Sequence, residues 1–178
     1  MKWYTHAAIG ANAVWLTVLF GEPTQTAILY TAVGAFAALL PDIDAGWTGS
    51  RGAKIHYIAG GLFGIFKGLF RHRGFFHSFL SIVLLFCALI PLAWMIDPLF
   101  PLIFTAGYAS HLFIDAWNGG MQWFYPLRKD LTFVPKFFRF RVGSAGDDLF
   151  FLLGVWGLIL FVFMHWSTFA SANLYLMR

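Results

Sequence analysis

The chain has 178 residues, of which 60% are hydrophobic, 20% are aromatic and only 11% are charged. A soluble globular domain contains about 25% charged residues, so this composition excludes a typical soluble domain and indicates one helical domain embedded in a membrane. The net charge of +4 does not require a nucleic-acid partner, and we expect none, because loop charges in a membrane protein report first on orientation. Cys87 is the only cysteine, which excludes a disulfide framework and a thiolate metal site.

Hydrophobic segments along the chain predict an all-α membrane protein with about five transmembrane helices. We place them at residues 5–20, 25–41, 76–96, 99–117 and 149–170. No small-x-small cleavage site follows the first segment, so we expect a retained helix and not a signal peptide. The breaks at Glu22-Pro23 and Asp97-Pro98 are short, which predicts two antiparallel helix hairpins.

Two longer segments, residues 42–75 and 118–148, connect the hairpins and the last helix. Both contain several basic residues, whereas the short breaks carry only acidic ones. The positive-inside rule therefore predicts that the N-terminus and both long loops are cytoplasmic and that the C-terminus lies outside.

Each long loop contains an apolar stretch. Residues 53–70 are apolar and glycine-rich, which favours an interfacial or re-entrant helix. Residues 123–141 alternate aromatic and basic side chains, which suits an anionic membrane surface, and the alternation over 138–142 is typical of an amphipathic strand.

Every predicted helix carries His or Asp side chains to the same predicted face of the membrane. The residues concerned lie at one end of each helix or next to it: His6, Asp42, Asp44, His72, His77, His111, Asp115, Asp147 and Asp148. His111 and Asp115 are four residues apart, so they share one helix face and can bind one cation. Imidazoles and carboxylates together suit zinc, manganese or a similar divalent ion.

Each of these residues taken alone has an ordinary explanation. A single histidine at a helix end is commonly an interfacial residue, as we expect for His165, and we leave His56 unassigned. Aspartates at helix ends can cap helices or pair with loop arginines. Ionisable groups near a membrane are nevertheless functional candidates, and the convergence of the whole set favours a functional site.

Four motifs follow one another in a specific order: His6, then LLPDID (39–44), HRGFFH (72–77) and GYASHLFID (107–115). This combination resembles the YdjM-like family of membrane-bound, metal-dependent hydrolases, over a stretch from His6 to about residue 148. That family is described as distantly similar to zinc-dependent phospholipase C and to single-strand nucleases of the P1 type.

The resemblance implies a metal-dependent hydrolase that holds one or two divalent ions, zinc or manganese. It implies a His-x-x-x-Asp ligand pair at His111 and Asp115. In the family a Gly-Ser-x-x-Glu pattern precedes the last helix, and here GSAGD places an aspartate where that glutamate stands. The implied metal ligands are His6, Asp42, Asp44, His77, His111, Asp115 and Asp147.

We predict hydrolysis of a phosphoester at the cytoplasmic membrane interface, with a phospholipid or another lipid phosphate as substrate. Asp42 and Asp44 divide the roles of metal ligand and general base, and His72 is a further catalytic candidate. Arg71 and Arg73 either bind phosphate or act only as positive-inside charges.

Two other functions are compatible with these residues. A cation transporter would need polar residues in the middle of its helices, and the third and fifth predicted helices are almost entirely apolar there. A scaffold with a structural metal site would need one closed set of four ligands, and the sequence offers more candidates than that.

Overall fold

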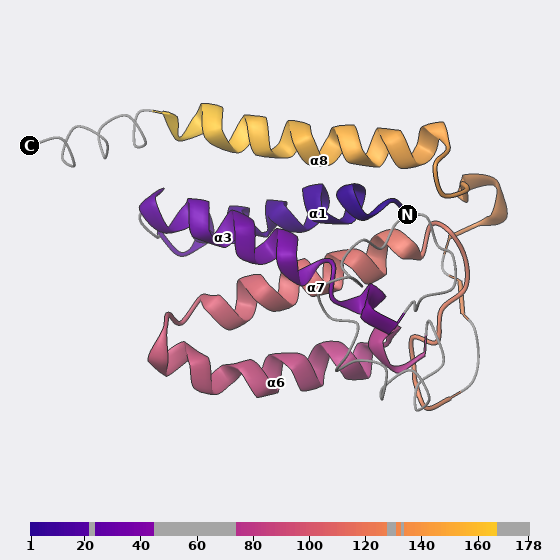
Figure 1. The fold of residues 1–178 in the computed structure, drawn as a ribbon, viewed down its shortest axis with the longest axis horizontal. Coiled ribbons are helices and arrows are strands. Elements are labelled where there is room, and N and C mark those ends of the chain that lie inside the picture. Colours follow the sequence, from indigo (N-terminus) through magenta and orange to yellow (C-terminus); the bar gives the residue numbers. More distant parts are fainter. Residues whose placement is uncertain (22–23, 45–73, 128–130, 133, 167–178) are drawn as a thin grey trace, which may run out of the picture.

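The computed structural model describes residues 1–21, 24–44, 74–127, 131–132 and 134–166 (Figure 1). The α-helices in these ranges are α1 (Trp3–Ala11), α2 (Trp15–Leu19), α3 (Thr24–Ala37), α6 (Phe79–Met95), α7 (Phe100–Asp115) and α8 (Ala145–Met164). Short 3-10 turns are η1 (Asn12–Val14), η2 (Pro41–Asp44), η3 (Phe75–His77) and η4 (Lys136–Phe138). Apart from one bridge between Met121 and Leu131, the described chain contains no strand pairing, which confirms the all-α prediction.

Each of the five predicted hydrophobic segments contains a helix, but their ends and regularity differ from the prediction. The first segment is an irregular rod of α1, η1 and α2, because the Asn12 amide donates to Ala8 O (2.8 Å) and to Gly154 O (2.9 Å) of α8. The predicted helix 25–41 ends at Ala37, four residues before Pro41 begins η2. The amphipathic strand predicted at 138–142 is wrong, because this stretch consists of the last residue of η4 and of irregular chain that pairs with no strand.

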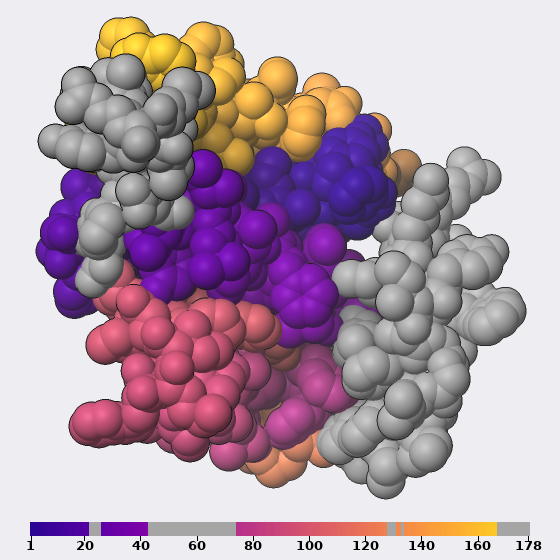
Figure 2. Space-filling model, turned by 60° about the vertical axis from the view of Figure 1, so that its left-hand side comes forward, coloured from indigo at the N-terminus to yellow at the C-terminus, as the bar shows by residue number. Residues whose placement is uncertain are grey.

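The helices run in alternating directions, so the start of α1, the end of α3, the start of α6, the end of α7 and the start of α8 lie on one side of the molecule (Figure 1). Helices α1, α3 and α7 pack against one another at the centre, α8 packs on α1, and α6 packs on α7. The surface shows the same order, with α8 at the top, α1 and α3 in the middle and the α6–α7 hairpin at the bottom (Figure 2).

Three glycines lie where the central helices approach most closely. A Cβ atom on Gly10 would lie 2.6 Å from Gly34 O, a Cβ on Gly34 would collide with Gly10 O, and a Cβ on Gly107 would collide with Gly34 O. Real side-chain carbons essentially never lie so close to a backbone oxygen. These positions therefore admit only hydrogen as a side chain, and the glycines set the spacing of α1, α3 and α7.

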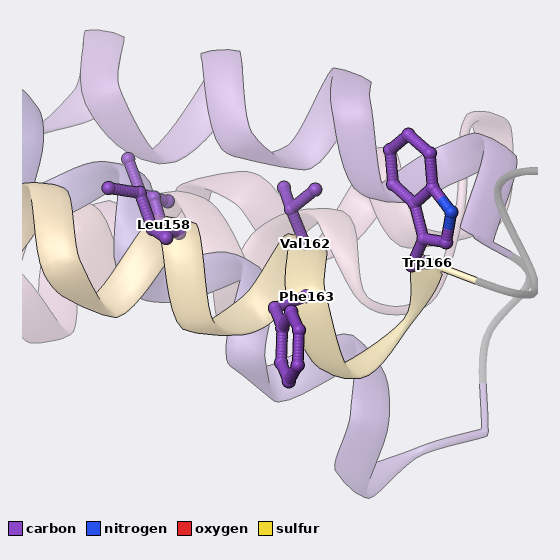
Figure 3. A pocket seen from close by; sticks show the side chains of 5 residues that line it. Leu158, Val162, Phe163 and Trp166 are labelled. Atoms are coloured by element: carbon purple, nitrogen blue, oxygen red, sulfur yellow. The ribbon is translucent and has the colours of Figure 1, made fainter.

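The outer surface of α8 is apolar and largely exposed. Among the described residues, α8 is the only helix that is both long and apolar enough to cross a membrane, with α6 and residues 26–37 apolar but shorter. The number of spans thus stays a prediction. Near the far end of α8 an open hollow of about 400 Å³ is lined by aliphatic and aromatic side chains (Figure 3): Leu158, Ile159, Val162, Phe163 and Trp166. None of these side chains can titrate, so the hollow offers no acid–base or metal chemistry.

Candidate metal centre

Four polar side chains gather at the end of the bundle where α3 and α7 finish and α6 starts. Asp42, His77, His111 and Asp115 each offer one ligand atom, and these atoms all lie within 4.8 Å of one another. His111 Nε2 lies 3.5 Å from Asp42 Oδ1 and 3.9 Å from Asp115 Oδ2. Ligand atoms around a tetrahedral zinc ion lie about 3.4 Å apart, given bond lengths of about 2.1 Å. A small contraction of this group would therefore suit a divalent ion.

The orientation of His111 leaves one ring nitrogen for a ligand. Its Nδ1 lies 2.7 Å from Ala38 O, and a carbonyl can only accept, so Nδ1 carries the proton and donates. In the neutral ring Nε2 then carries the lone pair that a metal needs. This Nε2 is buried and has no hydrogen-bond partner among the residues that the structure describes. An unsatisfied buried polar atom is costly, and a metal ion would relieve that cost.

His77 is held in place by hydrogen bonds around the turn η3. The Tyr108 hydroxyl donates to Phe76 O (2.6 Å), which ties η3 to α7. Ser78 caps α6 by accepting from Ser81 N (3.3 Å). The fully buried His77 ring meets the His111 ring edge-on, with centroids 5.3 Å apart. The motif HRGFFHS thus ends in a turn and a helix cap that present a histidine to the cluster.

Asp42 is the one partly exposed member of the cluster. Its side chain is 26% exposed, whereas those of His77, His111 and Asp115 are at most 4% exposed. Burial raises the pKa of Asp42, but the charge of the nearby His111, when that ring is protonated, lowers it by more, and the pKa lies well below its usual range. Asp42 is therefore an ionised carboxylate at the open side of the cluster.

His6 extends the cluster through Asp115. The His6 ring stacks on the His111 ring with centroids 3.8 Å apart, and His6 Nε2 lies 3.3 Å from Asp115 Oδ1. The Met1 nitrogen donates to the same oxygen (3.1 Å). Both ring nitrogens of His6 are buried without a hydrogen-bond partner in the described ranges. The two oxygens of Asp115 thus face different groups, Oδ1 toward His6 and Oδ2 toward His111.

Asp147 lies apart from the four-residue group and has a different set of contacts. It is fully buried, and its carboxylate accepts from Thr5 Oγ1 (2.8 Å), Lys2 N (3.1 Å) and Gly143 N (2.8 Å). These bonds join the start of α1 to the start of α8. The neighbouring Asp148 accepts from Lys2 Nζ (2.6 Å), and this hydrogen bond raises the pKa of Lys2.

The remaining predicted site residues cannot be placed in the cluster. Asp44 belongs to η2, next to Asp42, but its side chain lies outside the described part of the chain. Arg71, His72 and Arg73 lie outside the described residues altogether, as does the predicted interfacial segment 53–70.

Two supporting groups were not predicted from the sequence. Tyr108 lies three residues before His111, one turn away on the same helix, and this spacing is a signal that could have pointed to it. The Ala38 carbonyl has no such signal, because a backbone oxygen in an apolar segment carries no mark in the sequence.

The chain matches a family model described as YdjM inner membrane protein over residues 1–177. No curated protein and no solved structure matches the chain.

Proposed function

The chain belongs to the YdjM inner membrane protein family, and from this premise we propose that it is a membrane-bound, metal-dependent hydrolase that acts on a phosphoester. The observation that supports the proposal best is the group of ligand atoms from Asp42, His77, His111 and Asp115, which lie within 4.8 Å of one another at one end of the bundle. The partial exposure of Asp42 leaves one side of this group open. An open ligand set is typical of catalytic sites, whereas structural sites are closed.

Several residues of the chain would have separate roles in this hydrolysis. A bound divalent ion would supply Lewis acidity to activate water near neutral pH and to polarise a phosphoryl oxygen. His111 keeps its Nε2 directed at the site because Ala38 O holds its other nitrogen. Asp42 or Asp44 takes the proton from the attacking water as general base, and His72 assists it. Arg71 and Arg73 bind the phosphate of the substrate.

Asp115 is the residue that would allow a second ion. Its Oδ2 faces His111, at 3.9 Å, and its Oδ1 faces His6, at 3.3 Å. Asp115, together with His6 and His111, would then hold two ions, and such a pair would share the charge of a phosphoester. Zinc is our first choice for the ion and manganese the second, because mixed imidazole and carboxylate ligands suit both.

The proposed activity predicts hydrolysis that depends on both metal and aspartate. Purified protein in lipid should release phosphate or a headgroup from a phosphoester lipid, and removal of metal with a chelator should stop this until zinc or manganese is restored. Asp44→Asn should lower the rate by about 100-fold or more, the usual contribution of a general base or ligand. The measurement is a turnover screen over phosphoesters, peptides and amides. If no compound is turned over while metal is bound, the site is structural and the proposal is wrong.

We also propose that the metal centre faces the cytoplasm, because the basic residues of the sequence cluster in the segments 42–75 and 118–148, whose described ends lie at this end of the bundle. A Gly119→Cys variant in a Cys87→Ser background should react with a membrane-impermeant maleimide only after the cytoplasmic side has been opened. Trp94→Cys, at the other end of the bundle, is the matched control and should react in intact spheroplasts. Labelling of position 119 from outside would invert the topology.

A further inference from the structure

The segment Lys136–Val142, which we call the 136–142 surface, presents aromatic and basic side chains outward. Phe137 is 79% exposed and Phe138 is 56% exposed, and the flanking Lys136 and Arg141 are exposed as well. Large apolar side chains exposed beside cations are unfavourable in water alone. This combination indicates a partner that offers both apolar volume and negative charge.

The 136–142 surface is attached to the end of the molecule that carries the metal centre. Phe140 N donates to Trp117 O (3.3 Å), two residues after Asp115, and the Phe140 ring packs on the rings of Trp117 and Phe150. These contacts hold one side of the segment against α8 and the turn after α7, so Phe137 and Phe138 face outward from a fixed position.

The depth of this surface follows from α8. Helix α8 begins at Ala145 and is long and apolar enough to cross a membrane, with exposed apolar side chains from Leu149 onward. A span that starts there places residues 136–142 at the boundary between lipid and water. Apolar side chains such as Phe enter the membrane at that depth in interfacial segments, and basic side chains there attract anionic lipid.

The charges of the surface are available to a partner. Within the described ranges, neither Lys136 nor Arg141 forms an ion pair, and the two acidic residues that follow the segment are already engaged. Asp147 accepts three hydrogen bonds, and Asp148 pairs with Lys2. Arg139 is different, because its Nε donates to Val134 O (2.9 Å).

We propose that the 136–142 surface binds the anionic phospholipid of the membrane leaflet beside the metal centre. Phe137 and Phe138 enter the interfacial layer, and Lys136 and Arg141 bind phosphate groups of the lipid heads. This binding does not depend on the hydrolase activity, because none of the four side chains belongs to the metal cluster.

The test uses the full chain in nanodiscs. An environment-sensitive NBD dye is attached at Phe137→Cys in a Cys87→Ser background, in discs of phosphatidylcholine alone or with phosphatidylglycerol added. We expect a blue shift of the emission and quenching by brominated lipid that increase with phosphatidylglycerol and weaken with salt. Replacing Lys136→Gln and Arg141→Gln should reduce the preference for anionic lipid by about fivefold per residue. Arg139 is kept, because it supports the local fold.

The matched control is the same dye at Trp94→Cys, at the far end of α6. Trp94 is 90% exposed, and residues 74–127 contain no lysine or arginine, so its emission should not respond to phosphatidylglycerol. Equal emission at position 137 in both kinds of disc, or an equal response at position 94, would overturn the proposal. A blue shift of the same size with and without phosphatidylglycerol would also overturn it, since it would show apolar insertion without recognition of the headgroup.

Discussion

Replacing His111 with alanine should lower the metal affinity of the protein by about 100-fold or more, which is above the loss usual for a residue that only supports a ligand. The reason is geometric, because His111 Nε2 faces both Asp42, at 3.5 Å, and Asp115, at 3.9 Å. Asp115→Ala should act in the same way. The measurement is the metal content of protein purified in detergent, followed by titration of the metal-free protein with zinc and with manganese.

Two comparison variants separate loss of a ligand from loss of the fold. His165→Ala removes a histidine at the opposite end of the bundle, where Nδ1 contacts Phe161 O (2.9 Å), and metal binding should be unchanged. Asp147→Ala should lower the melting temperature, because it leaves Lys2 N and the buried Thr5 Oγ1 without their acceptor, yet bound metal should persist at saturating concentration. Metal retained by both His111→Ala and Asp115→Ala would rule out the site.

Replacing Gly34 with alanine should destabilise the protein by about 1–3 kcal/mol, the usual cost of overpacking a core, and should also weaken metal binding. The added methyl group would collide with Gly10 O, so α1 and α3 would have to separate. Ala38 lies four residues beyond Gly34, about 6 Å along the helix, and its carbonyl holds His111. Separation of the helices would therefore disturb the orientation of a metal ligand.

The measurement for Gly34→Ala combines thermal unfolding in detergent with the same metal titration. Ala32→Val is the matched control, because it enlarges an exposed side chain of the same helix two residues away and should change neither quantity. If Gly34→Ala melts and binds metal like the parent protein, the glycine contact does not set the spacing of the helices. If it melts lower but binds metal normally, the contact stabilises the bundle without positioning His111.

Much of the architecture could be predicted from the sequence, because it depends on local properties. A long hydrophobic stretch identifies a helix, and a short polar break with Pro separates it from the next, as at Asp97-Pro98, where Asp97 Oδ1 accepts from Leu99 N (2.7 Å) between α6 and α7. Short breaks between helices force antiparallel neighbours. The prediction that His and Asp residues gather at one end of the molecule needed no further information.

The grouping within that end could not be predicted in the same way. Only four of the predicted ligands form one group in the described part of the chain: Asp42, His77, His111 and Asp115. His6 lies beside this group and contacts it through Asp115 and the ring of His111. The sequence pattern does not distinguish the four residues of the group from His6.

Asp147 shows most clearly what a sequence pattern leaves open. Its position before the last helix is equally compatible with a metal ligand and with a residue that joins two helix starts. Its three hydrogen bonds to Thr5, Lys2 and Gly143 come from parts of the chain that meet only when α8 packs on α1.

The sequence by itself thus determined the helical membrane class of the chain, the order of its helices and the end of the bundle where its polar residues lie. These features follow from hydrophobicity and connection length, which act over a few residues at a time. The tertiary structure alone decided which side chains share a site, because that depends on the rotation of each helix about its axis and on the distance between helices. In this protein both are set where Gly10, Gly34 and Gly107 bring three backbones together, one turn from His6, Ala38 and His111.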